Sequence, residues 1–260
     1  MTAAAARADG SAPELLDTLA ADRATGALTT RSGIFYLAAG HVVHVESAHS
    51  PALGDLLTRS GALAPAGWWE AVERAGSRQR VGRQLVDSGR LTAGALELAH
   101  LGALFDAAYF ALAHDGTALR FRPGVTHWLG AVRPVTVATV LRESYRRRAL
   151  LDRIWPDAAV DTAPLARTPD ADPAVLPPRR GRALALVDGG RTAAQIASAL
   201  AHRTFHTLVE LRRLAADGLV APAPLVPAPP VHPVPGAGRA DWDEPDTALL
   251  RRLLDALEAL

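Results

Sequence analysis

Apolar and polar residues follow different patterns in successive stretches of the first half of the chain. The β-branched and aromatic runs GALTT, GIFYLAAG and HVVHVES (between residues 26 and 47) predict three short strands, with RSG and AAG as hairpin turns. A short helix, PELLDTLAAD, is expected before them. Residues 52–113 carry apolar side chains at helical spacing, and the alternating run TALRFRP predicts one returning strand.

An internal repeat lies in the helical stretch. The segment LGDLLTRSGALAPAGWWEAV (53–72) aligns with VGRQLVDSGRLTAGALELAH (81–100), and Gly61 matches Gly89. A glycine after a short helix is typical of a helix C-terminus, where its freedom to adopt positive φ ends the helix. The repeat therefore predicts two helix–turn–helix units that pack their leucine faces together.

The second half of the chain is predicted to be mostly helical. A long helix is expected from Pro134 to Ile154, followed by a proline- and aspartate-rich loop or run of short helical turns. Three helices then follow, with Thr192 as the cap of the second and Thr204 at the start of the third. Leu219 and Val220 are expected to open a short strand.

Proline and charge patterns divide the C-terminal end from the rest. Residues 221–238 are too rich in proline for a helix and predict an extended spacer. The last segment predicts a helix with a leucine stripe, whose candidate partner-binding residues are Leu250, Leu253 and Leu257. We expect this helix to dock on its own chain or on a second copy in a homodimer, with an outside partner as the alternative.

The predicted fold class is α+β: a mixed α/β domain with a small antiparallel sheet and a repeated helical unit, followed by a mostly helical domain. The expected boundaries are a flexible N-terminus (1–12), the α/β domain (13–132), a connecting helix (133–155), a loop (156–178), the helical domain (179–222), a proline-rich linker (223–240) and an amphipathic helix (241–260).

Composition excludes several classes of protein. The 28 basic residues, all arginine, nearly balance 27 acidic ones, so the chain is not a polycation built to coat nucleic acid or lipid. The absence of cysteine excludes disulfides and thiolate metal sites. No run is apolar enough for a signal peptide or a membrane span, and the arginine- and alanine-rich composition suggests a bacterial genome. We therefore expect a cytoplasmic protein without membrane contact.

The motifs of the first half resemble a known domain. The hairpin residues Gly26 and Leu28, the strand–turn–strand from Ile34 to Val43 and the repeated L-G-x-L-L-x-x-S-G-x-L units together resemble the PATAN-type domain of bacterial regulatory proteins. The resemblance covers residues 13–125. It implies a small α/β interaction module without catalytic residues.

The repeated units also resemble the N-terminal domain of type II secretion ATPases. A relative of that domain binds cyclic di-GMP through two Arg-Leu-Gly motifs. The equivalents here are Ala52-Leu53-Gly54 and Arg80-Val81-Gly82, so the first arginine is missing. A cyclic-dinucleotide sensor is the least favoured of the functions that we consider.

The C-terminal helices resemble the winged-helix domains of bacterial regulators. In such domains the third helix enters the major groove, and arginines around it contact phosphates. The candidate DNA-binding residues are Arg179, Arg180, Arg182, Arg191, Arg203, His206 and Arg213. The same fold also serves as a protein-interaction module with solvated arginines, and residues 133–225 carry a net charge of only +5 (14 Arg and 9 acidic residues).

Adjacent tryptophans, Trp68 and Trp69, are candidate partner-binding residues. Neighbours on a helix point about 100° apart, so both cannot face one core. At least one is expected to be partly exposed as an anchor for a partner; alternatively, one lies across the seam between the repeats.

No catalytic, cofactor or metal site is predicted. The sequence has no nucleophile elbow, P-loop or dinucleotide fingerprint. The pair His202 and His206 and the group His41, His44 and His49 are interpreted as ordinary surface histidines. The predicted function is a non-enzymatic transcriptional regulator that binds DNA and a protein partner; the alternative is a signalling adaptor that acts only through protein contacts.

Overall fold

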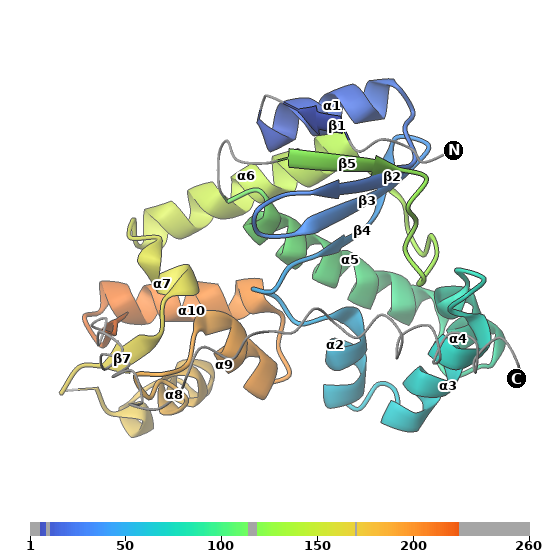
Figure 1. Cartoon of the computed structure of the whole chain (residues 1–260). Helices are drawn as coiled ribbons and strands as arrows, with labels where there is room; N and C mark the ends of the chain where they lie inside the picture. The colour runs from blue at the N-terminus through green and yellow to red at the C-terminus, as the bar shows by residue number, and fades with distance from the viewer. Residues whose placement is uncertain (1–5, 9–10, 114–118, 170, 224–260) are drawn as a thin grey trace, which may run out of the picture. The chain divides into compact units, whose positions relative to one another are not determined.

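The computed structural model describes residues 6–8, 11–113, 119–169 and 171–223. The chain divides into two units, residues 1–223 and 224–260, and every described residue belongs to the first. This unit is an α+β fold with a small antiparallel sheet, which confirms the predicted class (Figure 1). The proline-rich spacer beyond residue 223 and the leucine-striped helix with Leu250, Leu253 and Leu257 lie outside the described residues.

The main sheet has six strands in the order β1-β5-β2-β3-β4-β6, and neighbouring strands are antiparallel. The predicted hairpins form β2, β3 and β4, which lie side by side in Figure 1, and the returning strand is β5. The bounds are β1 (Ala6–Ala8), β2 (Gly26–Thr29), β3 (Ile34–Ala38), β4 (His41–Glu46), β5 (Leu119–Pro123) and β6 (Val135–Thr136).

A β-bulge in the β3–β4 pair determines which side chains share a face. Tyr36 pairs with His44 but Leu37 pairs with Val42, so Val43 is an extra residue without a partner. The bulge allows Val42 and Val45 to reach the same hydrophobic core although they are three residues apart. His44 and its cross-strand neighbour Tyr36 therefore lie on the opposite face of the sheet.

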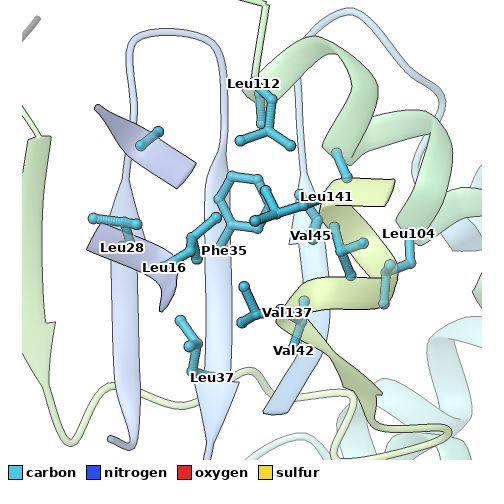
Figure 2. Close-up of a cluster of buried hydrophobic side chains, with 14 of the residues drawn as sticks. Leu16, Leu28, Phe35, Leu37, Val42, Val45, Leu104, Leu112, Val137 and Leu141 are labelled. Carbon is cyan, nitrogen blue, oxygen red and sulfur yellow. The ribbon is translucent and has the colours of Figure 1, made fainter. Parts of the chain in front are cut away.

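One face of the sheet is covered by α1 (Ala12–Ala21), α5 (Ala93–Ala111) and α6 (Val137–Ile154). Figure 2 shows this core, in which Phe35 of β3 lies among side chains from the helices and the neighbouring strands. The long helix was predicted from Pro134. It begins later because Val135–Thr136 pairs with β4 as β6 and Thr136 caps the helix by accepting from Thr139 N–H.

The sequence repeat forms two helix–turn–helix units, as predicted. They comprise α2 (Leu53–Arg59) with α3 (Pro65–Ala75), and α4 (Val81–Asp87) with α5. Gly61 and Gly89 have φ angles of 75° and 69°, the left-handed conformation expected after each short helix. Leucines of both repeats share one core: Leu53, Leu57 and Leu63 from the first, and Leu85 and Leu91 from the second.

The C-terminal helical region contains α8 (Pro178–Ala185), α9 (Ala193–Ala199) and α10 (Thr204–Ala216). Thr192 caps α9 in a reciprocal pair with Gln195, and α10 begins at Thr204, as predicted. The segment predicted as a loop or short helical turns contains α7 (Ala159–Thr162), the 3-10 turn η1 (Pro173–Val175) and, unexpectedly, strand β7 (Leu165–Arg167). The strand after α10, β8 (Val220–Pro222), pairs with β7.

Helix α5 joins these regions because it contributes to all three hydrophobic cores. Leu104 lies in the sheet core, Leu96 in the core of the repeats, and Tyr109 and Phe110 in the core of the C-terminal helices. Apolar residues occur all round this helix: its C-terminal half, residues 102–111, is almost entirely buried, whereas Leu98 nearer the N-terminus is 64% exposed.

Candidate functional site

A cluster of polar side chains lies on the sheet face opposite the main core. Glu46 at the end of β4 accepts hydrogen bonds from the Tyr36 hydroxyl (3.0 Å, at Oε2) and from His127 Nε2 (3.1 Å, at Oε1). His127 belongs to the segment after β5, and its ring packs edge-on against Tyr36 with centroids 4.8 Å apart. Two donors therefore orient one carboxylate.

Three histidine rings stack from this cluster into the interior. His44 stacks on His127 at 4.1 Å and on His100 of α5 at 5.5 Å. His100 Nε2 lies 2.9 Å from the carbonyl of Val43, the bulge residue. Within the described residues, Nδ1 of both His44 and His100 has no hydrogen-bond partner.

Burial determines the protonation states of the cluster. Burial, with smaller contributions from His127 and His100, keeps the pKa of His44 well below its usual value. Burial also lowers the pKa of His100 to about 4, although the bond to Val43 opposes the shift. The hydrogen bond from His127 lowers the pKa of Glu46, whereas burial raises that of Tyr36 to about 12. At neutral pH the cluster thus contains neutral His44 and His100, a neutral phenol and an ionised carboxylate.

The cluster borders a cavity of about 540 Å³. Its walls come from the β2–β3 hairpin, the end of β4 with the segment that follows, the start of α2, Trp68 of α3, Ala103 of α5 and residues 127–129. This volume falls within the range of about 300–1,000 Å³ that small-molecule sites occupy. The fold therefore places an oriented anion at the wall of a cavity of ligand size.

The side chains of His44, Glu46 and His127 also have the composition of a metal site, with ligand atoms within 4.8 Å of one another. The hydrogen bonds of His127 oppose that use. Leu129 N–H donates to His127 Nδ1 (3.2 Å), so a neutral ring carries its proton on Nε2, the nitrogen that faces Glu46. A metal needs a lone pair on Nε2. To provide one, the ring would have to carry its proton on Nδ1 and lose the hydrogen bond from Leu129 N–H.

A second polar network lies in the core of the C-terminal helices. Arg212, fully buried on α10, donates to Asp161 through Nε (2.7 Å) and Nη2 (2.8 Å). Tyr109 of α5 donates to the same carboxylate (2.6 Å), and Arg212 also donates to the Trp155 carbonyl. This ion pair is bidentate, and both charged groups form further hydrogen bonds within the core, as buried charges require.

A third set of contacts joins the first turn of α10 to α5 and α6. Asp106 of α5 accepts from Arg147 Nη1 (2.7 Å) and from the backbone N–H of Phe205 (3.1 Å). The Arg147 guanidinium also lies over the Phe205 ring, 4.4 Å from its centroid. The end of α10 that a DNA-binding domain would point into the groove is therefore in contact with the rest of the fold.

Most of the candidate DNA-binding arginines have partners within the chain. Arg180 pairs with Glu210 (3.4 Å) and Asp217 (2.8 Å), Arg213 with Glu210 (3.1 Å), and Arg191 with Asp188 (3.5 Å). Arg179 and Arg182 are exposed, and within the described residues neither forms an ion pair with a carboxylate.

The other two candidates differ from each other. Arg203 was expected to project outward, but its Nη2 donates to the Leu98 carbonyl of α5 (2.9 Å), and its guanidinium lies against Gly102. His206 is exposed, as expected. The candidate residues therefore do not form one continuous free basic surface, because Arg203 contacts α5 and three others pair with carboxylates.

The two adjacent tryptophans of α3 point in different directions, as helical geometry requires. Trp68 is buried in the core of the repeats against Gly54, whereas Trp69 is 63% exposed. Trp68 also forms an edge-to-face contact with Trp128 at 5.7 Å. Of the two candidate partner-binding residues, only Trp69 has an accessible face.

The prediction that the histidines of β4 lie on the surface was wrong for His44, which is 5% exposed. His41 is exposed and His49 half-buried. The sequence analysis missed His100 and His127, since one lies within a uniformly apolar helix and the other in a loop. Only the fold brings them to His44, and the pair His127 and Glu46 is separated by 81 positions.

The chain matches no family model, no curated protein and no solved structure at the significance required. The similarity to PATAN-type and winged-helix domains thus rests on the residues quoted above and stays a prediction. Among the described residues, no helix combines the length and the apolar character needed to cross a membrane.

Proposed function

We propose that the protein is a non-enzymatic regulatory protein that acts as a signalling adaptor through protein contacts. The observation that carries this proposal is the attachment of α10. Its first turn, the part that would read bases in a DNA-binding domain, contacts α5 and α6 through Asp106, Arg147 and Phe205.

Electrostatics supports the same proposal. A protein that binds DNA gains affinity by replacing the counterions of phosphates with free cationic side chains. On and around α10, Arg180 and Arg213 share Glu210, and Asp217 takes a further bond from Arg180. Pairing within the chain reduces the positive potential available to phosphates.

A partner surface is available on the α/β side of the unit. Trp69 exposes a large aromatic side chain on a helix whose other tryptophan is fixed in the core. Tryptophan is the residue type most enriched in interface hot spots. We assign Trp69 as the anchor for a protein partner.

DNA binding is the second candidate, because Arg179 and Arg182 are exposed on α8. Fluorescence anisotropy with a labelled mixed-sequence duplex at 50 and 200 mM salt separates the two. An adaptor shows no saturable binding at either concentration. A DNA-binding protein shows affinity that falls steeply with salt and weakens further in an Arg179→Ala/Arg182→Ala variant.

The adaptor proposal also makes a positive prediction. A photo-cross-linking amino acid at position 69 should give a discrete protein adduct in cells, whereas the same group at position 175, where Val175 is 79% exposed, should not. Adducts to nucleic acid alone, or identical adducts from both positions, would contradict the assignment of Trp69.

A further inference from the structure

The cavity beside Glu46 has the features of a ligand site that neither an adaptor nor a DNA-binding function requires. Its volume is about 540 Å³, and it lies between the β2–β3 hairpin, the start of α2 and residues 127–129. Two polar side chains, Tyr36 and His127, converge on the Glu46 carboxylate at this cavity, and convergent polar groups are typical of sites for small molecules.

Glu46 is an ionised carboxylate at the cavity wall. It accepts from Tyr36 and His127, and a carboxylate has about four lone-pair positions, so positions remain for a ligand. Its side chain keeps 43% of its surface exposed. Within residues 11–113, 119–169 and 171–223, no arginine forms an ion pair with it. Arg31 also lines the cavity, but within the described residues it forms no ion pair with Glu46, so the carboxylate is free to pair with a cationic group of a ligand.

The cavity walls favour a flat organic body. Trp68 and Trp128 meet edge to face at 5.7 Å, and Trp128 lies against His127 with ring centroids 4.8 Å apart. Trp128 is 37% exposed, so part of its surface remains available. Tryptophan faces pack against planar rings and attract cations through their negative π surface.

The tautomer of His127 argues against a metal ion as that cation. Its Nδ1 accepts from Leu129 N–H, so the proton on Nε2 points at Glu46 and occupies the direction from which a metal would bind. An organic cation needs no such lone pair, because it pairs with the free positions of the carboxylate while His127 keeps both of its hydrogen bonds.

We infer that the cavity binds a small, flat organic cation, an amidinium or a protonated amine on an aromatic body, whose charged group pairs with the Glu46 carboxylate. Tyr36 and His127 position that carboxylate, and the tryptophans contact the ring. The inference does not depend on whether the C-terminal helices contact protein or DNA.

The test uses three probes of nearly equal shape and different charge: benzamidine, benzamide and benzoate. Each is titrated into the full-length protein, with binding followed by ¹H–¹⁵N spectra of the backbone and of the tryptophan indole groups. We expect benzamidine to bind at least tenfold more tightly than benzamide, and benzoate not to bind. The shifts should include the indole N–H groups of Trp68 and Trp128.

Two matched variants locate the interaction. Glu46→Gln keeps the shape but removes the charge, and should weaken benzamidine at least tenfold. Glu97→Gln changes a carboxylate of α5 with a similar side-chain exposure of 40% outside the cavity wall, and should have no effect. Unchanged spectra of the free variants show that both fold.

Three results would overturn the inference. These are no binding of benzamidine, equal affinity for benzamide and benzamidine, and unchanged affinity of Glu46→Gln for benzamidine. A fourth measurement addresses the metal: zinc chloride titrated alone should not bind stoichiometrically. Zinc binding that is lost in both Glu46→Gln and His127→Phe would identify a metal centre in place of the organic-cation site.

Discussion

Two carboxylates near α5 accept a hydrogen bond from a tyrosine, and they differ in what else surrounds them. Asp161 is 5% exposed and receives Tyr109 together with two bonds from Arg212, so its charge is neutralised within the core. Glu46 accepts from Tyr36 and His127, remains 43% exposed and borders a cavity.

The difference separates a structural network from a binding site. A buried carboxylate that has its cation contributes to one fixed packing arrangement, and it can be disturbed only at a cost in stability. A half-exposed carboxylate that pairs with no arginine keeps its charge available for a ligand. A tyrosine–carboxylate pair alone therefore does not indicate function. What distinguishes the two carboxylates is that a buried arginine pairs with Asp161 and none pairs with Glu46 among the described residues.

The largest expected effect on stability comes from breaking the buried ion pair between Arg212 and Asp161. Arg212→Met should lower the free energy of unfolding by about 3–5 kcal/mol, because it leaves the Asp161 carboxylate buried without its cation. Arg213→Met, one residue later at an exposed position, should change it by less than about 1 kcal/mol. Urea denaturation of both variants measures the contrast, and equal losses would mean that the Asp161 pair is not a structural core element.

A smaller effect is expected from acid, at the interior end of the histidine stack. The native pKa of His100 is about 4, below its ordinary value of 6.5, so between these values the unfolded chain takes up a proton that the native state does not. Stability contributed by this residue is therefore present above pH 6.5 and lost as the pH falls towards 4.

Between pH 7 and 4.5 the wild type should lose about 2 kcal/mol more stability than His100→Gln. His41→Gln, which changes an exposed histidine, should follow the wild type. Urea denaturation at the two pH values provides the comparison. Parallel losses in His100→Gln and the wild type would show that His100 titrates normally in the folded state.

The smallest effect is expected at the contact between Arg203 and α5. A Cβ at Gly102 would lie 2.3 Å from the Arg203 guanidinium, so Gly102→Ala displaces that side chain and its bond to the Leu98 carbonyl. The loss of about 1 kcal/mol is offset by the higher helix propensity of alanine, so the net change should stay below about 1 kcal/mol.

Gly94→Ala serves as the matched control on the same helix, because open space surrounds Gly94. The difference in thermal unfolding between the two variants isolates the cost of displacing Arg203. A loss of several kcal/mol in Gly102→Ala alone would mean that Arg203, and not the buried Asp106, is the main attachment of α10 to α5.

Local signals made much of the fold predictable from the sequence. Gly61 and Gly89 mark helix ends because glycine, which has no Cβ, adopts positive φ without strain. Thr192 caps α9 by accepting from the backbone N–H of Gln195, three residues later. Strands β1, β6 and β7 were missed, and β1 lies within the segment 1–12 that was predicted to be flexible. Two or three residues carry no detectable period, and the partners β5, β4 and β8 are distant in the sequence.

The candidate site could not be predicted for a different reason. The site depends on the bulge at Val43, which turns His44 and Glu46 away from the main core, and on His127, which a loop brings to them. None of these residues belongs to a sequence motif with a characteristic spacing. Likewise, helical periodicity on α10 suggested Arg213 as a functional residue, whereas its neighbour Arg212 enters the core because Asp161 and Tyr109 provide partners there.

The most direct test of this account compares two isosteric substitutions, Glu46→Gln and Asp161→Asn, by urea denaturation under identical conditions. Asp161→Asn should lower the free energy of unfolding by about 3–5 kcal/mol, since Arg212 loses its buried counter-charge. Glu46→Gln should change it by less than about 1 kcal/mol, since its charge is half-exposed and, within the described residues, no arginine pairs with it. Equal losses in the two variants would contradict the distinction between a structural network and a binding site.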